Sequence, residues 1–261
     1  MKVRTLDPFA HEITELSIAS LDNDNLAELR RLATHDGVVV LRDQVVSDDQ
    51  FVQFLEQLAP LTFTVGEQPV AAQPKLNVVT NVGRARPPRS VFHTDTSYVS
   101  CPPSFTALRA VVTPSQGGET LFSNQYRAYD ALPAQLREQL ATARVRHEVT
   151  GLTLNNSAET GHWHPLLRRH PETGQTALYL STPERCVAVD GIDVSDPAQL
   201  LQDLYEHSTR AESLLVHRWQ PGDVILWDNR CTMHRADHSA VLGDRVLHRG
   251  MCAGEAPLAA H

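Results

Sequence analysis

The sequence predicts a mainly β protein, a double-sheet jelly roll with helices at its periphery. Short apolar runs separated by Gly, Pro and Asn residues fill the stretch from Leu76 to Asn124, and similar runs return between Ser213 and Cys252. Such runs are typical of a sheet core. Strands and helices do not alternate regularly, which argues against a doubly wound parallel fold. We expect residues 1–261 to form a single domain.

The N-terminal part predicts two helices with a strand between them. Apolar residues in the stretch Leu26–Leu32 recur at helical spacing, and Gly37 is placed to end that helix. The run VVVLR at Val38–Arg42 then reads as a buried strand. Ser47 and Gln50 form a capping box, which predicts the start of the second helix.

The remainder of the chain predicts mostly strands. We expect a helix at Ala128–Leu140 with Pro133 in its first turn, and another that Asp196 caps and Pro197 begins. The runs on either side of the turn PGD predict a β-hairpin or a corner. The predicted strands are LNVVT (76–80), VFHTDTSY (91–98), FTALRAVV (105–112), TLFSN (120–124), SLLVHRW (213–219), VILWD (224–228) and VLHRGMC (246–252).

Composition excludes several classes of protein. The net charge of −8 disfavours a nucleic-acid binder, which needs clustered basic residues. No apolar run approaches the roughly 20 residues that span a bilayer, and no apolar segment follows the N-terminus as in a secretory signal. The four cysteines form no CxxC pair, so they predict neither a zinc knot nor a disulfide scaffold. We therefore expect a cytoplasmic protein that binds no membrane.

A metal site is predicted by three residues. On a strand, His93 and Asp95 would project from the same face, because alternate side chains share a face. His234 follows the predicted strand VILWD in a polar loop and is the best third candidate. Two histidines and one carboxylate form the facial triad that suits non-haem Fe(II) and leaves coordination positions open.

Two arginines of the last strand indicate an anion site nearby. Arg245 and Arg249 are four residues apart, so both would face the same side of the strand. Burying two guanidinium groups costs free energy unless each binds an anion. The planar guanidinium matches the geometry of a carboxylate. Thr120 follows a Gly-Gly turn at the start of another strand, and its hydroxyl could share one carboxylate with an arginine.

Five motifs in order resemble the Fe(II)/2-oxoglutarate dioxygenases that act on taurine and on 2,4-dichlorophenoxyacetate. They are HTDTS, GGETLF, HPLLRRHPETG, WDNRCTMHRA and RVLHRG, and the early segment GVVVLRDQVVSDDQFVQF is also similar to that family. The resemblance covers the chain from about Leu21 to Cys252 and is far more specific than an HxD pair alone. It implies a double-stranded β-helix, which agrees with the fold predicted from the runs.

The resemblance also implies roles for individual residues. His93, Asp95 and His234 match the iron ligands, and Thr120 with Arg245 matches the pair that holds the distal carboxylate of 2-oxoglutarate. The implied cofactors are Fe(II), 2-oxoglutarate as co-substrate and O2. The residues that match or adjoin the substrate pocket are Arg249, Gln68 and Thr96.

Arg249 matches a position that contacts the acidic group of the substrate in the taurine enzyme. Gln68 stands where that enzyme has a sulfonate-binding histidine, and Ala71 replaces an aromatic residue beyond it, so the sequence argues against taurine itself.

We therefore expect an oxygenase that hydroxylates a small, anionic organic molecule and releases succinate and CO2. The outcome could equally be desaturation or another oxidation in a biosynthetic tailoring enzyme, and such enzymes often form homo-oligomers. Asp95 argues against the related iron halogenases, in which a small residue replaces the carboxylate. Two other classes use the same ligands, a metal-binding jelly-roll sensor or carrier without turnover and a zinc hydrolase. The retained pair Thr120 and Arg245 argues against the carrier.

Overall fold

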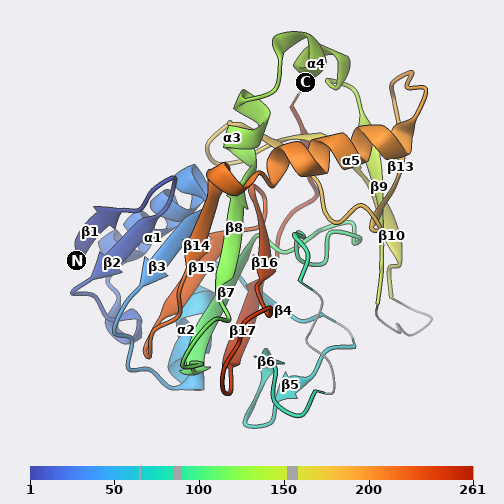
Figure 1. The fold of residues 1–261 in the computed structure, drawn as a ribbon. Helices are drawn as coiled ribbons and strands as arrows, with labels where there is room; N and C mark the ends of the chain where they lie inside the picture. The colour runs from blue at the N-terminus through green and yellow to red at the C-terminus, as the bar shows by residue number, and fades with distance from the viewer. Residues whose placement is uncertain (65, 85–89, 152–157, 261) are drawn as a thin grey trace.

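The protein, described here from a computed structural model, is a sandwich of a large and a small β-sheet with helices on its outside (Figure 1). The structure describes residues 1–64, 66–84, 90–151 and 158–260. The large sheet has the strand order β1-β2-β3-β15-β7-β17-β6-β5, with β4 paired to β17. Its strands are β1 (Lys2–Thr5), β2 (His11–Thr14), β3 (Val38–Leu41), β4 (Leu61–Thr62), β5 (Pro69–Val70), β6 (Gln73–Thr80), β7 (Phe105–Val112), β15 (Val224–Asp228) and β17 (Val246–Cys252).

The small sheet faces the large one and has the order β14-β8-β16. Its strands are β8 (Thr120–Asn124), β14 (Leu214–His217) and β16 (Thr232–Ala236). The chain passes from β14 in the small sheet to β15 in the large sheet through the turn at Pro221–Asp223. The predicted hairpin or corner is therefore a corner, and the jelly roll predicted from the sequence is confirmed.

The strand β3 shows why the sandwich has two cores. Val38 and Val40 point inward and pack with Phe122 of the small sheet and with Trp227. The alternate residues Val39 and Leu41 point outward and pack under the helices. Both faces of this strand are therefore covered, which explains its unbroken apolar sequence.

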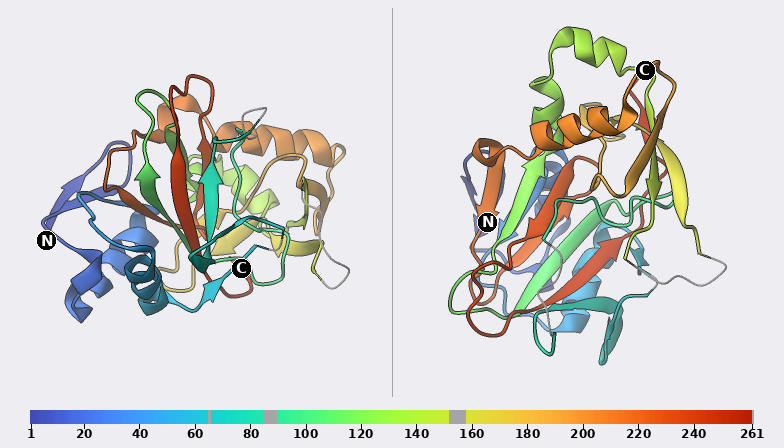
Figure 2. Two further views of the ribbon diagram at one scale, coloured as in Figure 1. Left: turned by 90° about the horizontal axis from the view of Figure 1, so that it is seen from below. Right: turned by 45° about the vertical axis from the view of Figure 1, so that its right-hand side comes forward.

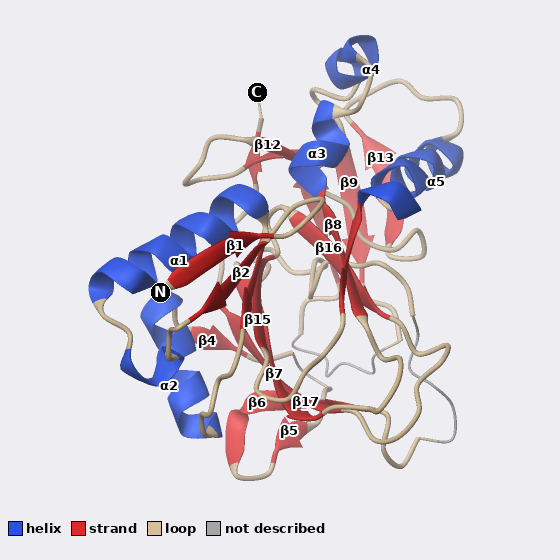
Figure 3. Cartoon of the chain, turned by 60° about the vertical axis from the view of Figure 1, so that its left-hand side comes forward, coloured by secondary structure: helices blue, strands red, loops and turns tan. Residues whose placement is uncertain are grey.

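Two helices cover the outer face of the large sheet (Figure 3). The helix α1 (Asn23–Asp36) starts at the cap Asp22 and ends at Gly37, and α2 (Asp48–Leu58) starts with the capping box of Ser47 and Gln50. The early helices were therefore predicted correctly, because caps are local signals that the chain carries in consecutive residues.

The remaining elements lie beyond one end of the sandwich (Figure 2). Helix α5 (Pro197–Ser208) has the predicted Asp196 cap and Pro197 in its first turn. The helices there are α3 (Gln125–Asp130), α4 (Ala134–Gln139) and α5, and the strands are β9 (Arg144–Glu148), β10 (Gly161–Pro165), β11 (Leu167–Arg169), β12 (Thr176–Leu178), β13 (Cys186–Asp190) and β18 (Leu258–Ala259). Two short 3-10 helices, Ile18–Ser20 and Ala211–Ser213, complete the elements of the described residues.

Three predictions of local structure were wrong. The single helix expected at Ala128–Leu140 is two helices, α3 and α4, with Pro133 between them as the cap of α4. Proline lacks an N–H and clashes with the preceding turn, so a helix cannot run through this position without a kink. His234 lies within strand β16 and not in a loop. The third prediction, the strand at 91–98, concerns the site directly.

The segment 91–98 is not a strand. His93 makes a single two-way backbone bridge with His234, with both N···O distances 3.0 Å, and the chain then turns at residues 95–98. Thr96 has a φ of +44° within that turn. A β-branched residue rarely adopts positive φ, so the surrounding contacts hold this turn in a strained form. The turn, and not strand alternation, brings His93 and Asp95 together.

Candidate metal centre and co-substrate site

The three predicted metal ligands converge between the sheets. One ligand atom from each of His93, Asp95 and His234 lies within 4.8 Å of the others, and this is the one such group found among the described residues. Asp95 Oδ1 is 3.7 Å from His93 Nε2 and 3.8 Å from His234 Nε2. His234 is placed by strand β16, and the bridge to His93 carries the other two ligands to it. Two imidazoles and one carboxylate around one point fit a non-haem iron.

The protein holds these side chains in the forms that bind a metal. Burial lowers the pKa of His93, and it lowers the pKa of His234 to about 3, so both rings are neutral at physiological pH. His93 Nδ1 lies 3.0 Å from the carbonyl oxygen of Val91, so an Nδ1–H donated there leaves Nε2 as the ligand atom. His234 Nδ1 is buried and has no hydrogen-bond partner among the residues that the structure describes.

Asp95 is held as a carboxylate. Burial alone would raise its pKa, but the neighbouring His234, Arg249 and His93 and a hydrogen bond from Thr106 hold the pKa well below its ordinary value. Thr106 Oγ1 donates to Asp95 Oδ2 at 2.9 Å, which leaves Oδ1 for the metal. Asn229 Nδ2 donates to Thr106 Oγ1 at 2.7 Å and so fixes the direction of that hydroxyl. Such supporting hydrogen bonds orient the ligand carboxylate.

Asp228 and Asn229, which precede His234 in the chain, belong to two different hydrogen-bond networks. Asn229 acts on Asp95 through Thr106. Asp228 accepts hydrogen bonds from Arg230 and His170 in a separate buried network. Thr106 was not predicted, because no sequence pattern relates it to a carboxylate eleven residues earlier.

Thr120 and Arg245 lie side by side, as the co-substrate site requires. Thr120 Oγ1 accepts hydrogen bonds from Arg245 Nη2 at 3.2 Å and from Trp219 Nε1 at 3.0 Å. Both lone pairs of that hydroxyl are then used, and its own proton remains to be donated. Arg245 Nε donates to the Gly118 carbonyl, while the buried Nη1 has no partner among the described residues. The two free donors fit one carboxylate.

Arg245 is a buried cation. It is 1% exposed, and it forms no ion pair among the described residues. Burial lowers the pKa of its guanidinium to about 10. A buried charge is costly unless an anion meets it, so this arginine is suited to a dicarboxylate ligand. Gly118 makes room for it, because a Cβ there would lie 3.0 Å from Arg245 Cδ at a φ of +75°.

Arg249 has two carboxylate partners of its own. Its Nη2 contacts Glu67 Oε2, and its Nη1 lies 3.4 Å from Asp95 Oδ1. Glu67 escaped prediction because it comes from the loop between β4 and β5, far from Arg249 in sequence. Gln68, its neighbour, is exposed, and its carbonyl oxygen accepts the Val78 N–H.

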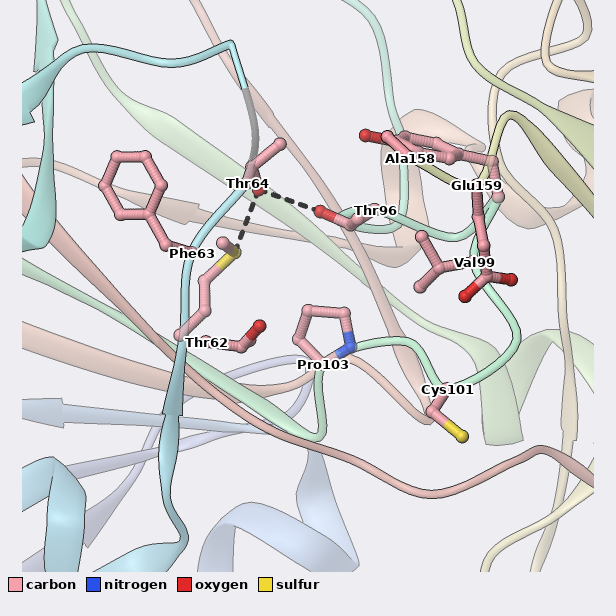
Figure 4. A pocket seen from close by; sticks show the side chains of 11 residues that line it. Thr62, Phe63, Thr64, Thr96, Val99, Cys101, Pro103, Ala158 and Glu159 are labelled. Carbon is pink, nitrogen blue, oxygen red and sulfur yellow. Dashed lines mark hydrogen bonds between the residues drawn. The ribbon is translucent and has the colours of Figure 1, made fainter. Parts of the chain in front are cut away.

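A cavity of about 180 Å³ is lined in part by Thr96, the residue after the ligand Asp95 (Figure 4). Thr64, Thr96, Tyr98, Glu159 and Met251 are among its lining residues. Thr96 Oγ1 and Thr64 Oγ1 are 3.0 Å apart, and the close-up shows this hydrogen bond at the wall of the cavity. Thr96 follows the ligand Asp95 directly, so the cavity adjoins the candidate metal centre. The segment between Val149 and Trp163, where the resemblance implies a lid over the substrate pocket, lies partly outside the described residues, at 152–157.

The buried ring of His164 contacts the carbonyl oxygen of Val99, a residue of the cavity wall, and it predicts acid sensitivity. Burial lowers its pKa to about 4, whereas the unfolded chain titrates near pH 6.5. The unfolded state therefore binds more protons between these values, and stability falls as the pH falls through that window. From about pH 7 to about pH 5.5, His164 should cost about 1 kcal/mol of unfolding free energy. Burial lowers the pKa of His147 well below its ordinary value, so it acts in the same direction.

Urea unfolding at the two pH values measures this loss. His164→Gln should reduce the difference between them, whereas the same change at the exposed His35 should leave the difference as in the wild type. An unchanged difference in His164→Gln would show that this ring does not titrate as its burial requires.

Comparison with known proteins identifies the class to which this fold and site belong. The family described as taurine catabolism dioxygenase TauD, TfdA family matches residues 2–251. The alpha-ketoglutarate-dependent 2,4-dichlorophenoxyacetate dioxygenase of Cupriavidus pinatubonensis is 29% identical, over 95% of this chain and 96% of its own. The alpha-ketoglutarate-dependent sulfate ester dioxygenase of Pseudomonas putida is also 29% identical, over 91% and 84%. A solved structure of a taurine dioxygenase from Burkholderia xenovorans superposes with a TM-score of 0.86 at 30% identity, covering 99% of this chain and 92% of that one.

The chain therefore belongs to the TauD, TfdA family. It is a 2-oxoglutarate-dependent dioxygenase that uses Fe(II), 2-oxoglutarate and O2. Family membership decides against the carrier and the zinc hydrolase that the ligand set alone also allowed. Among the described residues, no helix has the length and apolar character needed to cross a bilayer.

Proposed function

We propose that this chain hydroxylates a small anionic organic molecule, with His93, Asp95 and His234 as the ligands of Fe(II). The observation that carries the proposal is the convergence of these three side chains next to the unused donors of Thr120 and Arg245. Relatives named for 2,4-dichlorophenoxyacetate, sulfate esters and sulfonates support a substrate with one acidic group.

Each residue has a defined task in this proposal. Arg245 and Thr120 bind the distal carboxylate of 2-oxoglutarate and so set the direction in which its keto acid end lies. Fe(II) with 2-oxoglutarate supplies the chemistry that activates O2 and releases succinate and CO2. Thr106 keeps one oxygen of Asp95 away from the metal. Arg249 holds the other oxygen from outside the ligand set.

The substrate is proposed to occupy the cavity beside the ligands, where Thr96 contributes a hydroxyl to the wall. Val99, Pro103 and Met251 line the cavity together with hydroxyl groups, so it suits a substrate that has an apolar part. Gln68 is exposed in the structure, so its contact with substrate stays a prediction from the sequence.

The proposal is tested without knowing the substrate. Adding 2-oxoglutarate to the anaerobic Fe(II) protein is expected to produce a weak visible charge-transfer band, because the keto acid end binds the metal. Admitting O2 should then yield succinate at a slow rate, and a suitable small acid should raise that rate. A protein that binds Fe(II) but gives no band and no succinate would refute the proposed function.

A further inference from the structure

The substrate's acidic group needs a positive charge in the site, and Arg249 is already engaged. Its Nη2 contacts Glu67 and its Nη1 contacts Asp95. Both carboxylates come from the chain itself, and Arg249 is only 9% exposed. Arg249 Nε has no hydrogen-bond partner among the described residues, but the two carboxylates already neutralise the charge of this guanidinium.

A second guanidinium near the centre is free of such partners. Arg185 lies in the turn that leads into β13, and its Nη1 donates to the Thr94 carbonyl at 3.1 Å. Thr94 stands between the ligands His93 and Asp95 in the chain. Arg185 forms no ion pair in the described part of the protein, and its buried Nε has no hydrogen-bond partner there. The segments outside that part contain no Asp or Glu.

This guanidinium lies against the ring of Tyr98, a residue that lines the cavity, and is not itself one of the lining residues. Arg185 Cζ lies 5.4 Å from the centre of the Tyr98 ring, and Tyr98 lines the cavity. A cation over an aromatic face is attracted to it and keeps its plane fixed. Burial lowers the pKa of Arg185, although the nearby Tyr98 and Asp95 oppose the shift, so the cation is partly desolvated. The charge of Arg185 also acts on His93, which places it near the metal ligands.

We propose that Arg185 binds the acidic group of the substrate, which is a monoanion such as a carboxylate, sulfonate or sulfate ester. This assignment rests on the proposed function and adds the residue that selects the substrate. A guanidinium fork can bind two oxygens of such a group at once.

The test measures binding to the anaerobic protein loaded with Fe(II) and 2-oxoglutarate, where no turnover occurs. The probes are phenoxyacetate, butanesulfonate and butyl sulfate, each paired with a neutral analogue of the same shape, and calorimetry gives each dissociation constant. The wild type is expected to prefer at least one acid over its analogue by about tenfold or more, the ratio that a hydrogen bond to a charged group supplies. Arg185→Gln should abolish this preference, and Arg185→Lys should restore part of it.

Arg146→Gln is the matched control, because Arg146 lies on the neighbouring strand β9 and is paired with Glu148. It should keep the wild-type preference. A wild type without any acid preference, or an Arg185→Gln protein that retains it, would overturn the assignment. If Arg185→Gln keeps the preference and Glu67→Gln also strengthens acid binding by more than about tenfold, the acid binds to Arg249 instead.

The charge-transfer band separates this inference from the proposed function. The band should form in the wild type and in Arg185→Gln alike, which also shows that the variant is folded. A wild type without the band contradicts the proposed function. A normal band without acid preference contradicts only the role of Arg185.

Discussion

Replacing Asp95 with alanine is expected to lower the affinity for Fe(II) by more than about 100-fold, beyond the losses that follow changes to groups supporting a ligand. The carboxylate supplies the one anionic ligand of the triad, and its loss leaves two neutral imidazoles to hold a dication. Succinate formation should disappear with the metal. Titration of Fe(II) against a competing chelator, together with the band that 2-oxoglutarate produces, measures the effect. Arg249 keeps Glu67 as its partner, so this variant leaves no unpaired buried cation.

Thr106→Val provides the graded comparison. It keeps the carboxylate but removes the hydroxyl that donates to Asp95 Oδ2 and accepts from Asn229. We expect an affinity loss of about 10- to 100-fold, smaller than that of Asp95→Ala. If Asp95→Ala bound Fe(II) as the wild type does, the carboxylate would not be a ligand and the proposed centre would be wrong.

Replacing Arg245 with methionine is expected to weaken 2-oxoglutarate binding by about 100-fold, since two charge-assisted hydrogen bonds to a carboxylate contribute about 3 kcal/mol. The stability of the protein without 2-oxoglutarate should not fall with this replacement. Arg245 is a buried cation without a carboxylate partner in the described structure, and an apolar side chain of similar size avoids its desolvation. The free energy of unfolding should therefore stay within about 1 kcal/mol of the wild type or rise.

Arg109→Met is the matched control for this pattern. Arg109 lies on β7 and pairs with Asp48 at 2.6 Å on the opposite side of the large sheet from the ligands. Its loss should reduce stability while leaving the 2-oxoglutarate affinity within about twofold of the wild type. Equal 2-oxoglutarate affinities in Arg245→Met and wild type would remove Arg245 from the co-substrate site.

Local signals in the sequence were sufficient for the helices and for the identity of the ligands. The cap at Asp22, the capping box at Ser47 and the Asp196-Pro197 start each depend on residues within one helical turn, and all three are present. The error at Pro133 had a local cause too, since the proline was read as part of a first turn when it separates two helices. Motif order carried the family assignment, because five spaced signatures constrain a fold far more than one.

What surrounds the ligands could be read only from the folded chain. The turn at Thr96 replaces the expected strand because the bridge from His93 to His234 ends the pairing there, a contact between positions 141 residues apart. Thr106, Glu67 and Arg185 reach Asp95, Arg249 and Thr94 from separate loops and strands, and no spacing rule connects such positions. The sequence names the side chains that can bind a metal or an anion. Which arginine remains free for substrate is decided by the carboxylates that folding brings beside each one, since the Coulomb energy of a buried charge depends on its distance to its partner.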